Sequence, residues 1–327
     1  MRKLVTVRKV KEILPIEGAD NIELAKIDGW QCVVKKNELK TDDYCLYFEI
    51  DSLLPVREEF SFLANKGTKK MIHNGTEVIG YRLRTIRLRG QLSQGLALPI
   101  SAFAELANTP YPTDDDFAEV LGVLLYEAPI PAELNGDVEG SFPSFIPKTD
   151  EERIQNIEEN YIGATFTVTE KLDGTSCTIY MKDGLHVCGR NWEYKPSDKT
   201  MWRIARGIAA PFEGFAIQGE LVGPGIQSNP LKLQKVDLYV FYIYDFVKQK
   251  YLSSRESVTL SNMLGLKHVP VIYEDCDFIS CQDCLDLADR YSMLNDKVRA
   301  EGLVFRMNCE RKISFKAINN AYLLKQE

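Results

Sequence analysis

The chain has 327 residues, of which 45% are hydrophobic and 27% charged, and its formal net charge is −7. This composition is typical of a soluble globular protein, and the length favours two domains. The acidic balance argues against a uniformly basic coat for nucleic acid but is compatible with a local basic groove. No apolar run is long enough to span a membrane, and the basic N-terminus lacks an apolar signal core. We therefore expect a cytoplasmic protein.

Residues 1 to about 100 contain short segments of apolar alternation that turn-forming clusters separate. The clearest alternating segments are 4–7, 22–27, 30–34 and 44–50. Alternation with period two predicts strands, and several short strands at close spacing predict a small β-barrel.

A basic strip follows, with Arg82, Arg84, Arg87 and Arg89 inside eight residues. Arg82 and Arg84 share one face of a strand, and Arg87 and Arg89 share another after a shift of phase. Such a strip could follow a phosphate backbone. The alternative is a solvated face of the barrel, because runs of charge usually coat surfaces.

Residues 101–126 are amphipathic and carry an acidic patch at 114–116, and we expect one or two helices there. Residues 127–140 are rich in Pro and Gly and predict a linker. We therefore divide the chain into a barrel domain with a helical extension, 1–135, and a second domain, 136–327.

The eight cysteines are scattered, and in an intracellular chain we expect them to be reduced thiols. Cys281 and Cys284 form a C-x-x-C pair with Cys276 just upstream, which could hold part of a zinc site. Ordinary thiols are favoured, because a second C-x-x-C and a nearby histidine are both lacking.

In the second domain, Lys171 ends a run of alternating β-prone residues and is followed by an Asp173-Gly174 turn. A lysine can act as a nucleophile if its amine is held unprotonated. An exposed hairpin is the simpler alternative. Later apolar strands also carry charged residues, namely Glu220, Asp245, Glu301 and Lys316.

A charge in an apolar strand costs several kcal/mol unless it is paired, hydrogen-bonded or bound to a metal. A structural ion-pair network explains any one of these residues, but it explains the set less well. Between the strands we expect helices that begin at Thr149 or Asp150, helices over 197–206, 255–264 and 281–295, and a short final helix over 319–325.

The order of these features resembles the six motifs of covalent nucleotidyltransferases, a superfamily of polynucleotide ligases and mRNA capping enzymes. The matching segments are Lys171-Leu-Asp-Gly174, Arg190 in Gly-Arg-Asn, Glu220 in Gly-Glu-Leu, the aromatic strand 241–245, Glu301-Gly-Leu-Val304 and the strand that contains Lys316. Each match is weak alone, but their shared order and spacing make the resemblance specific.

Three further segments, 19–35, 48–55 and 145–155, resemble the Deinococcus-type RNA ligases. The resemblance implies an α+β fold, with an N-terminal OB-type β-barrel that binds RNA ahead of an ATP-grasp-like nucleotidyltransferase domain of antiparallel sheets and helices. It implies ATP-dependent sealing of a 3′-OH to a 5′-phosphate, through a lysyl-AMP and an adenylylated RNA 5′ end. The partner is RNA on a template, with a 5′-phosphate strand of RNA or DNA, and we expect a monomer.

The resemblance implies that Lys171 attacks the α-phosphate of ATP and that Lys316 neutralises the charge that develops there. Nearby positive charge would depress the pKa of the Lys171 amine. Asp173, Glu220 and Glu301 carry hard oxygen ligands and could hold a hydrated Mg²⁺ or Mn²⁺, in part through its waters.

Besides Lys316 and the stacking residue Tyr244, four residues are implied to contact the nucleotide. Arg190 would hold a phosphate, with Asn191 beside it in the same motif, Glu220 would also contact the ribose, and Glu170 would contact the adenine. On this view the basic strip becomes an RNA clamp as readily as a solvated face.

Two features of the site stay open. Tyr244 is our choice for stacking on adenine, although Tyr242 shares its face and Phe241 occupies the other. Many ligases carry two lysines separated by one residue in the last motif, and here Ser314 replaces the first of them. Lys312 could reach the same face of the strand.

Three rival functions can be weighed against features of the sequence. A GTP-dependent capping guanylyltransferase normally has its OB domain after the catalytic domain, whereas here the barrel comes first. The same order argues against a DNA ligase. The non-enzymatic rival is an OB-fold RNA-binding protein with a decayed transferase domain, which the intact lysine, acids and aromatic strand oppose.

Overall fold

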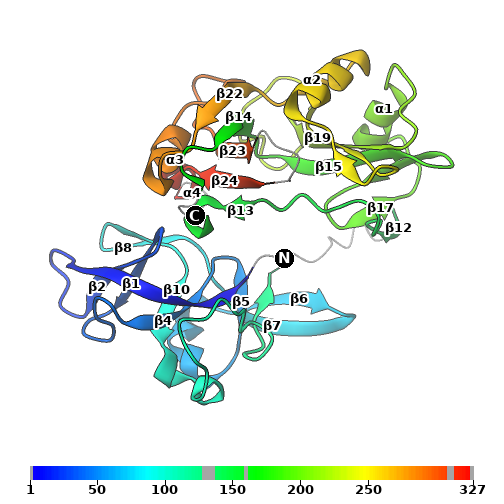
Figure 1. Ribbon diagram of the computed structural model, residues 1–327. Coiled ribbons are helices and arrows are strands. Elements are labelled where there is room, and N and C mark those ends of the chain that lie inside the picture. Colours follow the sequence, from blue (N-terminus) through cyan, green and yellow to red (C-terminus); the bar gives the residue numbers. More distant parts are fainter. Residues whose placement is uncertain (1–2, 127–136, 158–160, 308–312, 325–327) are drawn as a thin grey trace. The chain divides into compact units, whose positions relative to one another are not determined.

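The computed structural model describes residues 3–126, 137–157, 161–307 and 313–324 (Figure 1). It contains two compact units that divide between residues 130 and 131. The predicted boundary between 135 and 136 lies outside the described residues and stays a prediction. In the described part of the chain, none of the helices combines the length and the apolar character that crossing a membrane requires.

The first unit is built from three antiparallel sheets. The largest has the order β10-β4-β1-β2-β3, the second β11-β5-β7-β6, and the third pairs β8 with β9. The strands are β1 Val5–Pro15, β2 Ile22–Ile27, β3 Trp30–Lys35, β4 Tyr44–Phe48, β5 Ser52–Pro55, β6 Lys69–His73, β7 Thr76–Arg82, β8 Ile86–Leu88, β9 Gln91–Ser93, β10 Leu96–Pro99 and β11 Leu124–Leu125.

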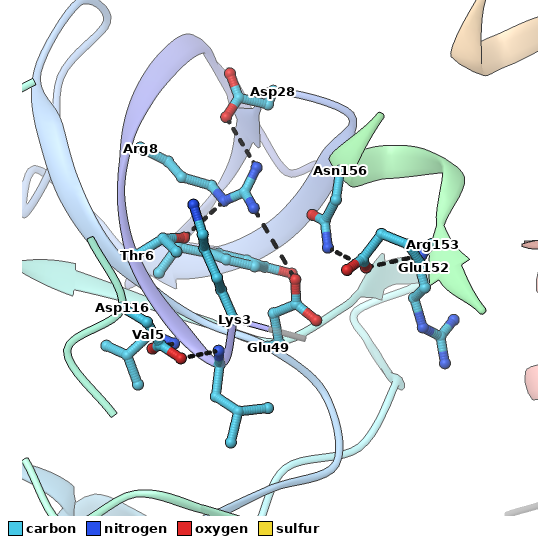
Figure 2. Close-up of polar contacts among 12 residues, drawn as sticks. Lys3, Val5, Thr6, Arg8, Asp28, Glu49, Asp116, Glu152, Arg153 and Asn156 are labelled. Atoms are coloured by element: carbon cyan, nitrogen blue, oxygen red, sulfur yellow. Dashed lines mark hydrogen bonds and ion pairs between the residues drawn. The ribbon is translucent and has the colours of Figure 1, made fainter. Parts of the chain in front are cut away.

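Strand β1 curls this unit, because its first half pairs with β4 and its second half with β2. A register shift between Val10 and Glu12 separates the two halves, as a bulge does when one strand must bend between partners. Arg8 lies just before the shift and donates hydrogen bonds to Thr6 and Asp28, at 2.9 and 3.2 Å (Figure 2).

The predicted helices over 101–126 are wrong. This segment and the one before it hold short 3-10 turns, η2 Ile100–Ala102 and η3 Ala104–Leu106, after an earlier 3-10 segment, η1 Glu58–Lys66. Pro110 and Pro112 interrupt the amphipathic pattern, since proline lacks the N–H that a helix needs. Asp116 fixes the loop beyond them, because its carboxylate accepts the backbone N–H groups of Leu4, Val5 and Ala118. Figure 2 shows this carboxylate beside Val5.

The second unit contains two sheets. One has the order β12-β17-β16-β15-β18-β19-β20 with β21 also paired to β19, and the other has the order β13-β24-β23-β14-β22. The strands are β12 Val138–Ser141, β13 Glu152–Arg153, β14 Thr165–Lys171, β15 Thr175–Met181, β16 Leu185–Cys188, β17 Trp192–Tyr194, β18 Phe215–Val222, β19 Asp237–Asp245, β20 Lys250–Tyr251, β21 Lys267–His268, β22 Val271–Asp277, β23 Gly302–Met307 and β24 Ser314–Ile318.

Helices cover these sheets and close their cores (Figure 1). They are α1 Thr200–Arg206, α2 Ser254–Met263, α3 Cys281–Ala288 and α4 Asn320–Leu323. Trp202 of α1 and Leu260 of α2 belong to the core of the larger sheet, and Cys284 of α3 belongs to the core of the smaller one. The helix predicted over 281–295 forms only over Cys281–Ala288.

The helix predicted to begin at Thr149 or Asp150 is also wrong. The chain forms β13 and the 3-10 turn η5 Ile154–Asn156 instead. Strand β13 pairs in parallel with β24, with Arg153 opposite Lys316, so sheet pairing overrides the local helical pattern. Glu152 accepts a hydrogen bond from Asn156 and holds the turn in place (Figure 2).

We expect Asp116→Ala to destabilise the first unit by about 1 kcal/mol, because three backbone N–H groups lose their acceptor. Urea unfolding followed by tryptophan fluorescence measures this, since Trp30 lies buried in the barrel core. Asp115→Ala is the matched control, since the Asp115 carboxylate accepts from the exposed Thr113 hydroxyl. Equal stabilities for the two variants would contradict the assigned role of Asp116.

Candidate active site

Lys171 is the last residue of β14, and its backbone pairs with Gly302 at the start of β23. Two glycines permit the close approaches around it. A Cβ at Gly302 would lie 2.2 Å from the carbonyl oxygen of Ala317, and a Cβ at Gly174 would lie 2.2 Å from that of Leu221. These glycines therefore allow β23 and the turn after Lys171 to pack against neighbouring backbone.

Lys171 is surrounded by acidic side chains from three elements. Its Nζ donates to Oε1 of Glu301 at 2.7 Å, and Glu301 directly precedes β23. Glu220 reaches it from β18, and Asp173 lies in the turn two residues after it. The Tyr322 hydroxyl of α4 donates to Asp173 and helps to orient that carboxylate.

Burial and the neighbouring charges shift the pKa values of Lys171, Glu220 and Glu301 in opposite directions. Burial alone lowers the pKa of Lys171, but Glu301, Glu220 and Asp173 together raise it above its ordinary value. Burial raises the pKa of Glu301. It also raises that of Glu220, to about 8, against the opposing effect of Lys171. Without further positive charge, Lys171 is thus held as an ammonium.

The carboxylates fit a hydrated cation better than a directly bound one. Among the described residues, His, Cys, Asp and Glu side chains form no group of three or more that could hold a metal ion. Oε2 of Glu301 is nevertheless buried without a hydrogen-bond partner, and Glu220 carries a raised pKa. Hard oxygen donors of this kind suit Mg²⁺ or Mn²⁺ held through its waters.

Lys316 and Arg190 both contact Asp150. Nζ of Lys316 lies 3.1 Å from one oxygen of that carboxylate, and a guanidinium nitrogen of Arg190 lies 3.7 Å from the other. The structure therefore connects these two cations, as the motif order suggested. In the sequence, Asp150 stands out only as a candidate helix cap, and its position two residues before β13 gives no signal of this role.

The side chain of Asn191, which the sequence groups with Arg190, accepts a hydrogen bond from Lys148 at 2.8 Å. Ser314 donates to Glu151, and the Tyr242 hydroxyl donates to the other oxygen of the same carboxylate at 2.5 Å. Lys312 lies outside the described residues.

Glu170 is a buried acid beside the nucleophile, with a relative exposure of 2%. Burial raises its pKa, while hydrogen bonds from Ser292 and the Met293 backbone oppose that shift. The Met293 N–H donates to Oε2 at 2.8 Å, and Oε1 is buried without a hydrogen-bond partner. An unsatisfied buried acceptor of this kind suits a ligand donor such as an amino group.

The aromatic strand β19 places its rings differently from the expectation. Tyr244 is 7% exposed and packs in a cluster with Ile146 and Ala216, so its ring is covered by protein. Phe241 instead packs against the cluster that contains Leu172, the residue after the nucleophile. The structure thus brings Phe241, and not Tyr244, into the surroundings of Lys171.

The four arginines of the basic strip divide into two groups. Arg82 is bound within the first unit, with Asp51 at 2.7 Å and the ring of Tyr126 at 4.6 Å from its guanidinium carbon. Arg84, Arg87 and Arg89 are exposed. Three of the four side chains are therefore placed where a phosphate backbone could reach them.

Comparisons with known proteins agree with this architecture. Residues 4–100 match an OB-fold domain model, and residues 164–318 match the RNA ligase family model. Among curated protein sequences, none is significantly similar to this chain.

Solved structures of the Naegleria gruberi RNA ligase are similar over nearly the whole chain. A variant of that enzyme with ATP and Mn is 42% identical, with 99% of each chain covered and a TM-score of 0.86. A variant with AMP and Mn is 42% identical, with 100% of this chain and 99% of that chain covered and a TM-score of 0.86. The enzyme with pyrophosphate is also 42% identical, with 99% of this chain and 98% of that chain covered and a TM-score of 0.84.

The chain therefore belongs to the RNA ligase family. This confirms the predicted fold class, an N-terminal OB-fold followed by a ligase nucleotidyltransferase domain.

We expect Glu220→Gln to become more stabilising as the pH rises. The Glu220 carboxyl has a pKa of about 8 in the folded chain against an ordinary value of 4.5, so the folded state binds the extra proton. Stability from this group is complete below pH 4.5 and is lost as the pH rises through 8. Glutamine stays neutral and escapes that loss.

Thermal unfolding from pH 5 to pH 9 measures the effect, with the exposed Asp198→Asn as the control for charge removal. The melting temperature of Glu220→Gln should exceed that of the unsubstituted protein by a few degrees at pH 9 and by less at pH 5. A difference that is constant over this range, or one that shrinks with pH, would count against the buried charge.

Proposed function

We propose that this protein is an ATP-dependent RNA ligase of the Deinococcus type, which joins an RNA 3′-OH to a 5′-phosphate across a nick in a templated duplex. The observation that carries the proposal is the pairing of Lys171 with Glu301 beside Glu220 and Asp173. The Naegleria enzyme with the same domain order is described with ATP, AMP and pyrophosphate. ATP is an intracellular cosubstrate, so this activity belongs inside the cell, in the cytoplasm.

In the first step, the lone pair of Lys171 Nζ attacks the α-phosphorus of ATP and forms a P–N bond. The bond from phosphorus to the bridging oxygen breaks, pyrophosphate leaves with that electron pair, and the nitrogen loses a proton to water. Asp173, Glu220 and Glu301 would hold a Mg²⁺ or Mn²⁺ ion, which would supply positive charge that favours the neutral amine. Lys316 stabilises the negative charge on the α-phosphate.

The remaining nucleotide contacts follow from the placement of each side chain. Arg190, with Asn191 beside it, holds a phosphate. The unsatisfied oxygen of Glu170 accepts from the adenine amino group, and Glu220 contacts the ribose. For stacking we replace Tyr244 by Phe241, because Phe241 packs near Leu172 while the Tyr244 ring is covered.

In the second step, an oxygen of the RNA 5′-phosphate attacks the phosphorus of lysyl-AMP, the P–N bond breaks and Lys171 is regenerated. In the third, the RNA 3′-OH attacks the 5′-phosphate, loses its proton and displaces AMP. The exposed Arg84, Arg87 and Arg89 contact the backbone of the substrate, whereas Arg82 supports the barrel through Asp51. One chain carries all these groups, so we propose that the enzyme acts as a monomer.

Incubation with labelled ATP and Mg²⁺ or Mn²⁺ should give an acid-labile AMP adduct on the protein. Lys171→Ala removes the nucleophile and should form no adduct. Lys182→Ala is the matched control, because that lysine lies on the surface against Phe145. An adduct on Lys171→Ala would sink the proposal, and an adduct with GTP but not ATP would favour a capping enzyme.

The RNA specificity is tested with nicked duplexes that differ only at the 3′-OH side of the nick. Sealing should require a ribonucleotide strand there and should tolerate RNA or DNA on the 5′-phosphate side. Equal sealing of an all-DNA nick would indicate a DNA ligase. Retention of RNA without any adduct would indicate a binding protein.

We expect Lys316→Ala to slow adduct formation about 100-fold, the usual cost of losing one charge donor to a developing anion. The rate of adduct formation at saturating ATP should show this effect, because the charge of Lys316 is needed most in the transition state. Single-turnover kinetics separate that rate from the apparent affinity for ATP. A loss confined to affinity would assign Lys316 to ground-state binding.

A further inference from the structure

Both cations assigned to phosphates contact an anion of the chain itself. The Asp150 carboxylate lies 3.1 Å from Nζ of Lys316 through one oxygen and 3.7 Å from Arg190 through the other. A phosphate presents the same charge and the same kind of oxygen to these donors. Asp150 and a bound phosphate therefore require the same two partners.

The backbone around Asp150 is held from two sides. Its neighbour Glu151 is bound by the hydroxyls of Tyr242 and Ser314. Two residues further on, Arg153 of β13 pairs with Lys316 of β24 itself. The carboxylate is thus tethered at a fixed short distance from the lysine that it contacts.

The Asp150 side chain is partly exposed to water. Asp150 has 34% of its side chain exposed and Arg190 has 65%, whereas Lys316 has only 12%. An aspartate with this exposure can turn toward water about its own χ angles without moving the strand. A ligand phosphate can therefore replace the Asp150 carboxylate at Lys316 and Arg190 without a change in the sheet.

We propose that Asp150 is an internal anion that holds Lys316 and Arg190 in the free enzyme and is displaced from them when a polyphosphate binds. It competes with any ligand phosphate that uses these cations, and inorganic pyrophosphate is the simplest polyphosphate with which to probe that competition. The inference rests on the proposed function, which assigns the two cations to phosphates.

The test is the affinity of the full-length protein for inorganic pyrophosphate, measured by calorimetry without ATP. Asp150→Asn should bind pyrophosphate about tenfold more tightly, because one like charge near the ligand is removed. Asp150→Ala should give the same direction, and unfolding curves without ligand check that both variants fold. Asp198→Asn removes an equal charge from the surface and should change the affinity little.

A second readout uses the adenylylated protein. Added pyrophosphate returns AMP from lysine to ATP, and at low pyrophosphate this reversal should be faster in Asp150→Asn than in the unsubstituted enzyme. A purely structural role for Asp150 would not tighten pyrophosphate binding. Unchanged or weaker binding in both folded variants would overturn the proposal, and weaker binding would make Asp150 a residue that positions the cations.

The ligase function and the role of Asp150 can be disproved separately. If the unsubstituted protein forms no AMP adduct, the proposed function is wrong whatever pyrophosphate does. If it forms the adduct but Asp150→Asn gains no affinity for pyrophosphate, only the role of Asp150 is wrong.

Discussion

The pairing of Lys171 with Glu301 is the interaction on which the site depends, and it creates a conflict. Three carboxylates keep the lysine charged, with its pKa raised, whereas a nucleophile must lose its proton. A divalent cation held by Asp173, Glu220 and Glu301 would resolve the conflict, because it would offset their negative charge and favour the neutral amine.

Close backbone contacts make this arrangement possible. Gly174 lies against the Leu221 carbonyl of β18, which places the Asp173 turn near Glu220, while Gly302 lies against β24 and follows Glu301. The two sheets of the second unit therefore each contribute acids to one lysine. The glycines in the lysine and glutamate motifs are steric requirements of this packing, and larger residues would push the strands apart.

Much of the site was predictable because a charge in an apolar strand is visible in the sequence. Lys171, Glu220, Glu301 and Lys316 stood out in this way, and the motif order connected them. The face of β19 on which Phe241 lies was not predictable, because a register shift opposite Gln218 and Gly219 breaks the alternation of this strand. Phe241 is the extra residue in that bulge, so counting by twos misassigned its face. The role of Asp150 was not predicted, because its partners Arg190 and Lys316 are distant in the sequence. The helices over 101–126 were predicted wrongly, because prolines and Asp116 favour a loop there.

The serine at position 314 fits the contacts of its neighbours. Glu151 is satisfied by two neutral hydroxyls, from Ser314 and Tyr242, where a lysine would have supplied a full charge. The guanidinium of Arg306 lies 3.6 Å above the ring of Tyr242, and its NH2 group donates to the Phe241 carbonyl at 2.5 Å. Positive charge thus reaches this part of the site from β23 instead of from position 314 on β24. Because Arg306 also donates to the Phe241 carbonyl, this charge holds the backbone of β19 at the residue that we propose for stacking.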